Sequence, residues 1–347
     1  MPFPDFLGIG AQRSGTSWLA KNLSRHPEIW MPPLKELHYF DQRINEPSFG
    51  APLARFLAKG KHVDDWYPWV WRYQLKWRLK AHWEKFDPRS ALWDFRFFAR
   101  SPSERWYASL FEQGRGKITG EVTPQYSILE EEVISRIHNL MPQAKIIFLM
   151  RNPIERAFAA SVWRLHLLMA RNLIRGQTFE AATNEQLFEG FDHPEVRSET
   201  GYLQTLEKWR RFYPDDQIFV GFIEDVHFYP IRLLRHLYRF LGVDASYAEK
   251  ALKRKVNARS PKKMAAEVAG HLARTYYKDL QLLSERFGGY TSFWLYCAER
   301  LVNDSLHNGT IPYPLWNSWL WEEWVNQSPS SISAYPKEGR VQSGALA

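Results

Sequence analysis

The 347-residue chain contains a single cysteine, Cys297, and lacks any long apolar segment. One cysteine cannot form an intrachain disulfide, which is typical of proteins in a reducing compartment. No run approaches the roughly 18 consecutive apolar residues of a transmembrane helix. The N-terminal residues MPFPDFLGIG also lack the basic and apolar regions of a signal peptide. Together these absences predict a cytoplasmic protein.

The sequence also lacks the motifs of several enzyme classes. No HExxH, HxxxH or CxxC pattern is present, so we expect no catalytic metal. No GxSxG nucleophile motif occurs either. What the chain does have is an ordinary globular balance of 45% apolar and 24% charged residues, which excludes a disordered protein. Its formal net charge of +8 favours acidic ligands.

The hydrophobic pattern predicts an α/β fold with a parallel sheet. Continuous apolar runs at 5–10, 144–150 and 217–223 indicate strands buried on both faces, and 117–122 is a fourth candidate. Helical segments follow these strands, at 17–25 and 231–241. Asn152 and Pro153 are typical of a helix N-cap and first turn, and Gly242 of a helix end.

Two segments differ in composition from the rest. Residues 49–115 are rich in Trp, Arg and Lys and are predicted to be an insertion, a possible lid over the binding site of an acceptor substrate. Residues 326–347 are rich in Ser, Gly and Pro and are predicted to be a disordered tail, which leaves 1–325 as a single domain.

Within the insertion, residues 66–86 form an aromatic and basic run with helical spacing. Aromatic rings at 3- and 4-residue intervals alternate with cations: Trp66, Trp69, Tyr73 and Trp77 with Arg72, Lys76, Arg78 and Lys80. Such a helix can lie at a lipid interface as a peripheral membrane contact. Alternatively, it packs its aromatic stripe on the core or forms a lid over the acceptor.

The first strand leads into a loop that suits an anion. The residues GAQRSGTS (10–17) carry the spacing GxxxxG followed by two hydroxyl residues, between a strand and a helix N-terminus. Free backbone N–H groups and the helix dipole at such a junction favour phosphate binding. In a nucleotide triphosphatase the residue after the second glycine is Lys, whereas here it is Thr16 and the cation is Arg13. A triphosphatase also needs an acidic magnesium ligand, but the strand at 144–150 ends at Arg151.

Three motifs in order resemble the PAPS-dependent sulfotransferases, particularly bacterial members and the sulfotransferase domains of heparan-sulfate enzymes. They are GAQRSGTSWL (10–19), LKELHYFD (34–41) and MRNPIERAFAASVWRL (150–165). The resemblance implies a P-loop-type three-layer fold with a central parallel sheet, an aromatic-rich helical insertion and a helical C-terminal extension. It implies PAPS as sulfuryl donor, without a metal, and no nucleic-acid partner.

By resemblance, the first motif holds the 5′-phosphosulfate through Arg13, Ser14, Gly15, Thr16 and Ser17. Arg13 would also neutralise the oxygen of the breaking S–O bond. Trp18 either flanks the nucleotide or lies in the core.

The third motif would bind the 3′-phosphate through Arg151. Family members carry a serine eight residues later, where this chain has Ala159. Ser161 is the nearest hydroxyl, but two helical residues rotate it by about 200° from that position. A phosphate contact from the basic segment 253–263, including Arg259, would compensate; alternatively, that segment is a solvated charge run.

The second motif supplies the predicted general base. Glu36 matches the acidic base of the heparan-sulfate relatives, and in an extended segment Glu36 and His38 share one face while Lys35 points to the other. Either Glu36 or His38 could accept the acceptor's proton.

The sequence therefore predicts a sulfotransferase that transfers the sulfuryl group to a hydroxyl of a sugar, glycan or amphiphilic alcohol. The alternatives are a P-loop kinase and a non-enzymatic glycan- or membrane-surface-binding protein. The oligomeric state and the identity of the acceptor remain open.

Overall fold

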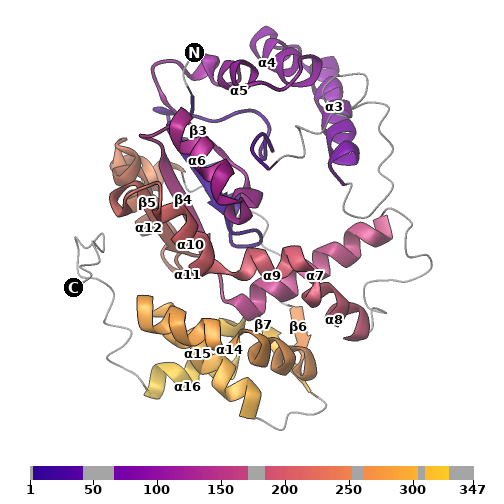
Figure 1. Cartoon of the computed structure of the whole chain (residues 1–347), viewed down its shortest axis with the longest axis vertical. Coiled ribbons are helices and arrows are strands. Elements are labelled where there is room, and N and C mark those ends of the chain that lie inside the picture. The colour runs from indigo at the N-terminus through magenta and orange to yellow at the C-terminus, as the bar shows by residue number, and fades with distance from the viewer. Residues whose placement is uncertain (1–2, 42–65, 171–183, 252–261, 304–308, 328–347) are drawn as a thin grey trace.

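The computed structural model describes residues 3–41, 66–170, 184–251, 262–303 and 309–327. At its centre lies a parallel five-stranded sheet with the order β2-β3-β1-β4-β5 (Figure 1). The strands are β1 (Phe6–Gly10), β2 (Ile29–Trp30), β3 (Ile118–Val122), β4 (Lys145–Met150) and β5 (Ile218–Phe222). The four longer strands lie within one residue of their predicted bounds. The two-residue β2 was missed because it is too short to give a hydrophobic pattern.

Helices make up most of the remaining described chain. In order, they are α1 (Thr16–Leu23), α3 (Trp66–Glu84), α4 (Pro88–Ala99), α5 (Glu104–Ser109), α6 (Glu131–Leu140), α7 (Pro153–Ala170), α8 (Asn184–Asp192), α9 (Pro194–Thr200), α10 (Tyr202–Arg210), α11 (Ile223–Phe228), α12 (Pro230–Leu241), α13 (Ala248–Ala251), α14 (Ala266–Phe287), α15 (Tyr290–Asn303) and α16 (Trp319–Gln327). Short 3-10 turns are η2 (Glu112–Gly114), η3 (Pro124–Ile128), η5 (Asp215–Gln217), η6 (Ala245–Tyr247) and η7 (Leu315–Asn317).

The sheet separates two hydrophobic cores, which makes the fold three-layered. In β4, Ile146, Phe148 and Met150 join the core that includes residues of α6 and α10. The alternate residues Ile147 and Leu149 join the core formed with α1 and α12. Burial on both faces explains why the strand sequence is continuously apolar. The predicted P-loop-type α/β fold is confirmed.

Two helix boundaries also agree with the sequence. The side chain of Asn152 accepts a hydrogen bond from the backbone N–H of Ile154 at 3.1 Å, and α7 begins at Pro153. At the end of α12, Gly242 has a left-handed backbone (φ 81°), and its N–H bonds the carbonyls of Arg239 and Tyr238. Both ends are therefore set by local residues.

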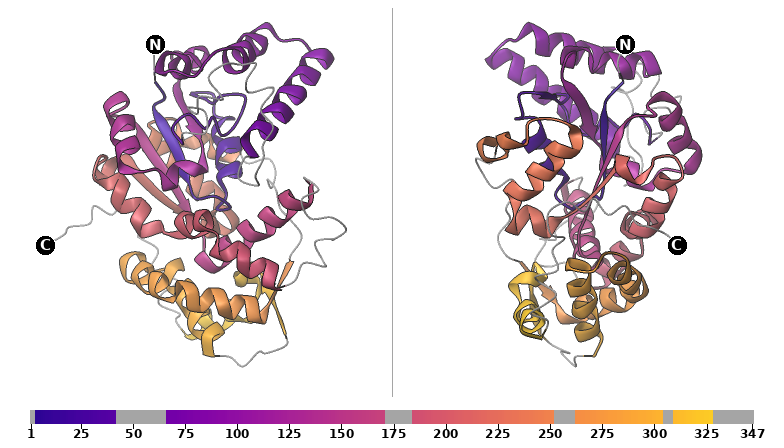
Figure 2. Two further views of the ribbon diagram at one scale, coloured as in Figure 1. Left: turned by 45° about the vertical axis from the view of Figure 1, so that its right-hand side comes forward. Right: turned by 90° about the vertical axis from the view of Figure 1, so that its left-hand side faces the viewer.

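The insertion is helical where it is described, and α3–α5 lie at the opposite end of the molecule from α14–α16 (Figures 1 and 2). α3 packs on α4 through Trp71, whose ring centroid lies 5.3 Å from that of Phe98. Arg78 of α3 donates from Nε to both oxygens of Asp94 at 2.9 Å. The prediction that the aromatic stripe faces the core is wrong for Tyr73 and Trp77, because both are exposed.

The C-terminal extension is also helical, as predicted. The long helices α14 and α15 pack together, and β6 (Lys262–Ala265) pairs antiparallel with β7 (Thr310–Tyr313). α16 continues to Gln327, two residues into the predicted tail; residues 328–347 lie outside the described part of the chain. The division into one domain and a tail stays a prediction.

Candidate active site

The loop between β1 and α1 has the backbone geometry of an anion cradle. Arg13 and Gly15 adopt left-handed conformations, with φ values of 67° and 93°. Gly15 is the N-cap of α1 and offers no side chain to the first N–H groups of the helix, and the first helical turn contains no acidic residue. These N–H groups therefore face the loop with the positive end of the helix dipole behind them.

Arg151, at the end of β4, reaches this loop. Its Nη1 donates a hydrogen bond to the backbone carbonyl of Arg13 at 3.2 Å. The contact follows from the topology, because β1 and β4 are parallel neighbours and their carboxyl ends meet at one edge of the sheet. The structure thus brings Arg151 to the backbone of the loop that carries Arg13, the cation that the sequence assigned to the other end of a nucleotide.

Arg151 is further held by an ion pair that the sequence analysis missed. Glu155, one helical turn later, accepts from Arg151 Nε at 2.9 Å and lies 2.8 Å from Nη2. The second oxygen of Glu155 accepts the backbone N–H of Leu315 at 2.6 Å, and the ring of Tyr313 lies 5.0 Å from the guanidinium. The C-terminal extension therefore braces Arg151. The i,i+4 spacing of Arg151 and Glu155 was the available sequence signal.

Tyr202 of α10 is a second missed residue in this region. Its hydroxyl donates to the carbonyl oxygen of Arg151 at 2.8 Å, and Ser14 of the loop lies beside it. Burial raises the pKa of Tyr202 to about 12, so its hydroxyl stays protonated and remains a donor at neutral pH.

The other predicted loop residues differ in their surroundings. The guanidinium of Arg13 lies 4.9 Å from the ring centroid of Trp163 in α7. Ser14 and Thr16 are buried, whereas Gly15 and Ser17 are partly exposed. Trp18 is buried in the core between the sheet, α1 and α12. This favours a structural role for Trp18 over contact with the nucleotide.

Of the two predicted sources of an extra phosphate contact, only Ser161 lies within the described residues, and it does not face the loop. Ser161 is fully buried, and a Cβ added at Gly190 of α8 would lie 3.0 Å from its side chain. Ser161 thus faces α8, as expected from its rotation relative to Ala159, which is partly exposed. Arg259 lies outside the described residues.

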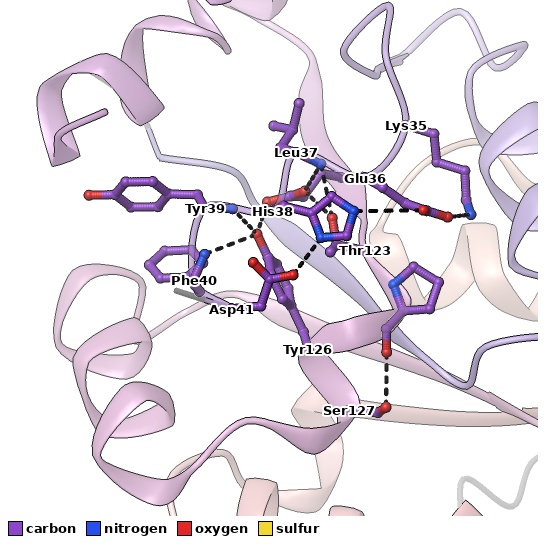
Figure 3. Close-up of polar contacts among 12 residues, drawn as sticks. Lys35, Glu36, Leu37, His38, Tyr39, Phe40, Asp41, Thr123, Tyr126 and Ser127 are labelled. Carbon is purple, nitrogen blue, oxygen red and sulfur yellow. Dashed lines mark hydrogen bonds and ion pairs between the residues drawn. The ribbon is translucent and has the colours of Figure 1, made fainter. Parts of the chain in front are cut away.

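The second motif crosses the carboxyl end of β3 next to the loop (Figure 3). The backbone N–H of Glu36 bonds the carbonyl of Val122 at 3.2 Å. The segment is not an extended strand, because Glu36 and His38 have φ values of 66° and 55°. Their side chains nevertheless meet, with Glu36 Oε2 at 3.8 Å from His38 Nε2.

Lys35 and Asp41 complete this cluster, and both were missed. The expectation that Lys35 points away is wrong, because its Nζ pairs with Glu36 and donates to Thr16 Oγ1 at 3.3 Å. Asp41 pairs with His38 Nδ1, three residues away. Asp41 belongs to the motif LKELHYFD, so its position after His38 was visible in the sequence. Through Lys35, the second motif contacts the phosphate loop directly.

The cluster sets the charges of its two candidate bases. Burial alone would raise the pKa of Glu36, but Lys35 and His38 outweigh burial and hold that pKa well below its usual range. Burial alone would lower the pKa of His38, but Asp41 and Glu36 outweigh it and raise the pKa to about 9. At neutral pH the cluster therefore contains a Glu36 carboxylate and a His38 imidazolium. The imidazolium has no lone pair with which to accept a proton.

The unusual backbone of residues 36–41 is anchored by buried groups from β3 and η3 (Figure 3). The N–H of Leu37 bonds Thr123 Oγ1 at 3.1 Å, and Thr123 donates to Glu121 at 2.7 Å. The hydroxyl of Tyr126 accepts from the N–H of Tyr39 at 3.0 Å and donates to Glu121 at 3.1 Å. Since Tyr39 follows His38 directly, these bonds fix the segment that carries the cluster.

Comparison with known proteins identifies the class. The sulfotransferase family matches residues 4–247, and the chain belongs to this family. The membrane-associated sulfotransferase kil1 of Dictyostelium discoideum is 27% identical over 156 residues, which are 45% of this chain and 22% of that protein. The bifunctional heparan sulfate N-deacetylase/N-sulfotransferase of Drosophila melanogaster is 25% identical over 249 residues, 69% of this chain and 20% of that protein.

A similar fold occurs in the crystal structure of a sulfotransferase from Alicyclobacillus acidocaldarius. It aligns with a TM-score of 0.54 at 21% identity, over 85% of this chain and 99% of that chain. The chain spans only about a fifth of the length of the curated relatives it matches. Family membership does not favour the P-loop kinase or the non-enzymatic alternative. Within the described residues, no group of three or more His, Cys, Asp or Glu side chains is arranged to hold a metal ion.

The charge state of His38 can be measured directly. Because its folded pKa of about 9 lies above the unfolded value of 6.5, protonated His38 stabilises the fold fully below pH 6.5. That contribution is lost as the pH rises through about 9. We expect the NMR titration midpoint of His38 to lie near 9 and to fall in Asp41→Asn. His236 is the internal reference, and its pKa is lowered by burial. It should titrate identically in both proteins. A His38 midpoint below 7 in the wild type would contradict this electrostatic picture.

Tyr126 is predicted to be a positioning residue. Tyr126→Phe removes the hydroxyl that holds the Tyr39 N–H, so turnover in a sulfotransferase assay should fall about tenfold while affinity for the donor nucleotide is retained. The loss of a buried hydrogen bond should cost about 1–3 kcal/mol of stability. Tyr213→Phe is the matched control, because it removes another buried hydroxyl, which donates to the Met141 carbonyl at 3.1 Å. Equal activity losses in the two variants would show that Tyr126 acts only through stability.

Proposed function

We propose that this protein is a PAPS-dependent sulfotransferase that transfers the sulfuryl group to an acceptor hydroxyl and releases adenosine 3′,5′-bisphosphate. The observation that carries the proposal is the hydrogen bond from Arg151 to the carbonyl of Arg13. It joins a phosphate-binding loop that carries Arg13 to a second cation, the buried Arg151, which suits a nucleotide with anionic groups at both its 5′ and 3′ positions. Membership of the sulfotransferase family supports an enzyme of this class.

The residues around the loop fit a 5′-phosphosulfate. The uncapped N-terminus of α1 offers backbone N–H donors, and Arg13 and Lys35 offer positive charge from two sides. Bound there, PAPS supplies an activated sulfuryl group whose leaving group is a phosphate. Arg13 and Lys35 would then balance the negative charge that develops on the leaving oxygen, as cations do in phosphoryl transfer.

Arg151 can bind a 3′-phosphate without losing its present partners. A guanidinium carries five N–H donors, enough to hold Glu155, the carbonyl of Arg13 and a phosphate oxygen together. Glu155 and the ring of Tyr313 fix its orientation before the ligand arrives. Such preorganisation reduces the entropy that binding would otherwise lose.

Glu36 is the proposed general base, and His38 orients it. The Glu36 side chain is 32% exposed, so an acceptor can reach it, whereas the His38 side chain is almost fully buried. The ammonium group of Lys35 lowers the basicity of Glu36. An anion bound in the loop competes for Lys35, since Lys35 also contacts Thr16. Donor binding would therefore raise the basicity of Glu36 when the acceptor's proton has to be removed.

The proposed acceptor is a hydroxyl of a sugar, a glycan or an amphiphilic alcohol. The glycan class of acceptor, but not the choice of a hydroxyl over an amine, is supported by the matches to bifunctional heparan sulfate N-deacetylase/N-sulfotransferases, each over 69% of this chain. The donor's product and the acceptor's ester are both anionic, and the net charge of +8 suits them.

Nucleotide binding tests the donor assignment. Adenosine 3′,5′-bisphosphate should raise the melting temperature, with or without EDTA, and should bind better than AMP. Arg151→Ala should weaken bisphosphate binding by about 1.5–3 kcal/mol and reduce the preference over AMP, because a charge-assisted hydrogen bond to the 3′-phosphate is lost. Arg211→Ala, at an exposed ion pair with Glu131, is the control and should bind like the wild type. Stronger stabilisation by ATP with Mg²⁺ would favour a kinase instead.

Kinetics at saturating PAPS test the base. Glu36→Gln keeps the size of the side chain but cannot accept a proton, so turnover should fall by about 10²–10⁴. Bisphosphate affinity should remain near that of the wild type. His38→Asn should lose less, because it affects only the position of Glu36. A normal Glu36→Gln beside an inactive His38→Asn would transfer the role of base to His38, and two normal variants would exclude both.

A further inference from the structure

The hairpin formed by α3 and α4 carries an unusual amount of exposed apolar surface. Nine large hydrophobic side chains are exposed in the described part of the chain, and seven of them lie between residues 73 and 95. Trp83 is 92% exposed and Phe86 69% exposed. Tyr73, Trp77, Leu79 and Phe95 are each more than half exposed. We call these six side chains the hairpin patch. Clustered exposed rings of this kind mark an interaction surface.

The hairpin patch is not an unpacked core face, because a different face of α3 already packs on α4. Trp71 is 2% exposed and lies against Phe98, and Arg78 and His82 both bind the carboxylate of Asp94. These contacts fix the rotation of α3 on α4. The patch residues of α3 therefore lie off the face that packs on α4, and Phe95 is an exposed residue of α4 itself.

The charges beside the hairpin patch are mainly positive. Lys76, Lys80, Lys85 and Arg89 are exposed, against the carboxylates of Glu84 and Asp87. Asp87 is partly satisfied as the N-cap of α4. Exposed lysines between exposed aromatic rings are the composition of helices that lie at the surface of an anionic bilayer, with the rings among the acyl chains and the ammonium groups at the headgroups.

We propose that the α3–α4 hairpin docks this protein peripherally on membranes that contain anionic lipids. An acceptor cleft explains the patch less well, because side chains that line a cleft lose much of their exposure to its walls, whereas Trp83 touches almost nothing. A second copy of the chain is also disfavoured, because a twofold interface would bring the same lysines face to face. None of the helices in the described ranges is long and apolar enough to span a membrane, so the contact proposed is a surface one.

Vesicle co-sedimentation of the full chain tests the docking without any catalysis. The protein should bind phosphatidylcholine vesicles that contain phosphatidylserine, bind pure phosphatidylcholine more weakly, and lose affinity as salt rises. The double variant Trp77→Ser/Trp83→Ser should lose roughly tenfold or more in partitioning, because both rings leave the bilayer. Lys76→Glu/Lys80→Glu should lose binding only to the anionic vesicles.

Leu282→Ser is the matched control, since Leu282 is exposed on α14, outside the hairpin, and should sediment like the wild type. Melting temperatures should be unchanged in all variants, because the substituted side chains are on the surface. Glu36→Gln should also sediment like the wild type, which separates docking from the proposed reaction.

Three results would overturn the docking proposal. The first is wild-type protein that stays in the supernatant with anionic vesicles at low salt. The second is vesicle binding that survives both double variants. The third is a dimer or a complex with single-stranded oligonucleotide that the tryptophan variant abolishes, in the absence of vesicle binding; this would assign the patch to a second copy or to nucleic acid.

Discussion

The carboxyl edge shared by three parallel strands, β3, β1 and β4, determines where the phosphate loop, Arg151 and the segment with Glu36 lie. β1 ends in the phosphate loop, β4 ends in Arg151, and the segment with Glu36 crosses the end of β3. Parallel neighbours must end at the same edge, so residues more than a hundred positions apart come within hydrogen-bonding distance. The chain reverses its direction of winding between β1 and β4, the position at which such sheets bind ligands.

Charges gathered at this edge have to be compensated, and the cluster around Glu36 shows how. Glu36 and Asp41 flank His38, while Lys35 bridges Glu36 and the loop. Glu36 and Asp41 both raise the pKa of the His38 imidazole, and Lys35 and His38 both lower the pKa of Glu36. The cluster is therefore stable as a set of charged groups. Tyr126, itself bonded to Glu121, anchors the backbone next to the cluster through the N–H of Tyr39.

The sequence was sufficient for the fold and for the order of the motifs, since buried strands, caps and glycine turns are local signals. It also placed Glu36 beside His38, although through an extended geometry that the positive φ values rule out. It could not place Lys35, because the direction of that side chain depends on the non-repetitive backbone. Nor could it predict the contacts of Glu155 with Leu315, which join residues 160 positions apart. Such long-range contacts follow from packing and leave no local pattern.

These contacts from the C-terminal extension have a consequence for the site. The region matched by the sulfotransferase family ends at residue 247, yet Tyr313 and Leu315 hold Arg151 and Glu155 from beyond it. Behind them, burial together with Glu155 raises the pKa of Glu224 to about 8, and Glu224 accepts from the indole of Trp294 at 2.7 Å. Because Glu224 is largely neutral, no unpaired carboxylate is buried beside the carboxylate of Glu155. The extension therefore supports Arg151 and Glu155 directly, and a chain shortened to the matched region would leave both side chains without these contacts.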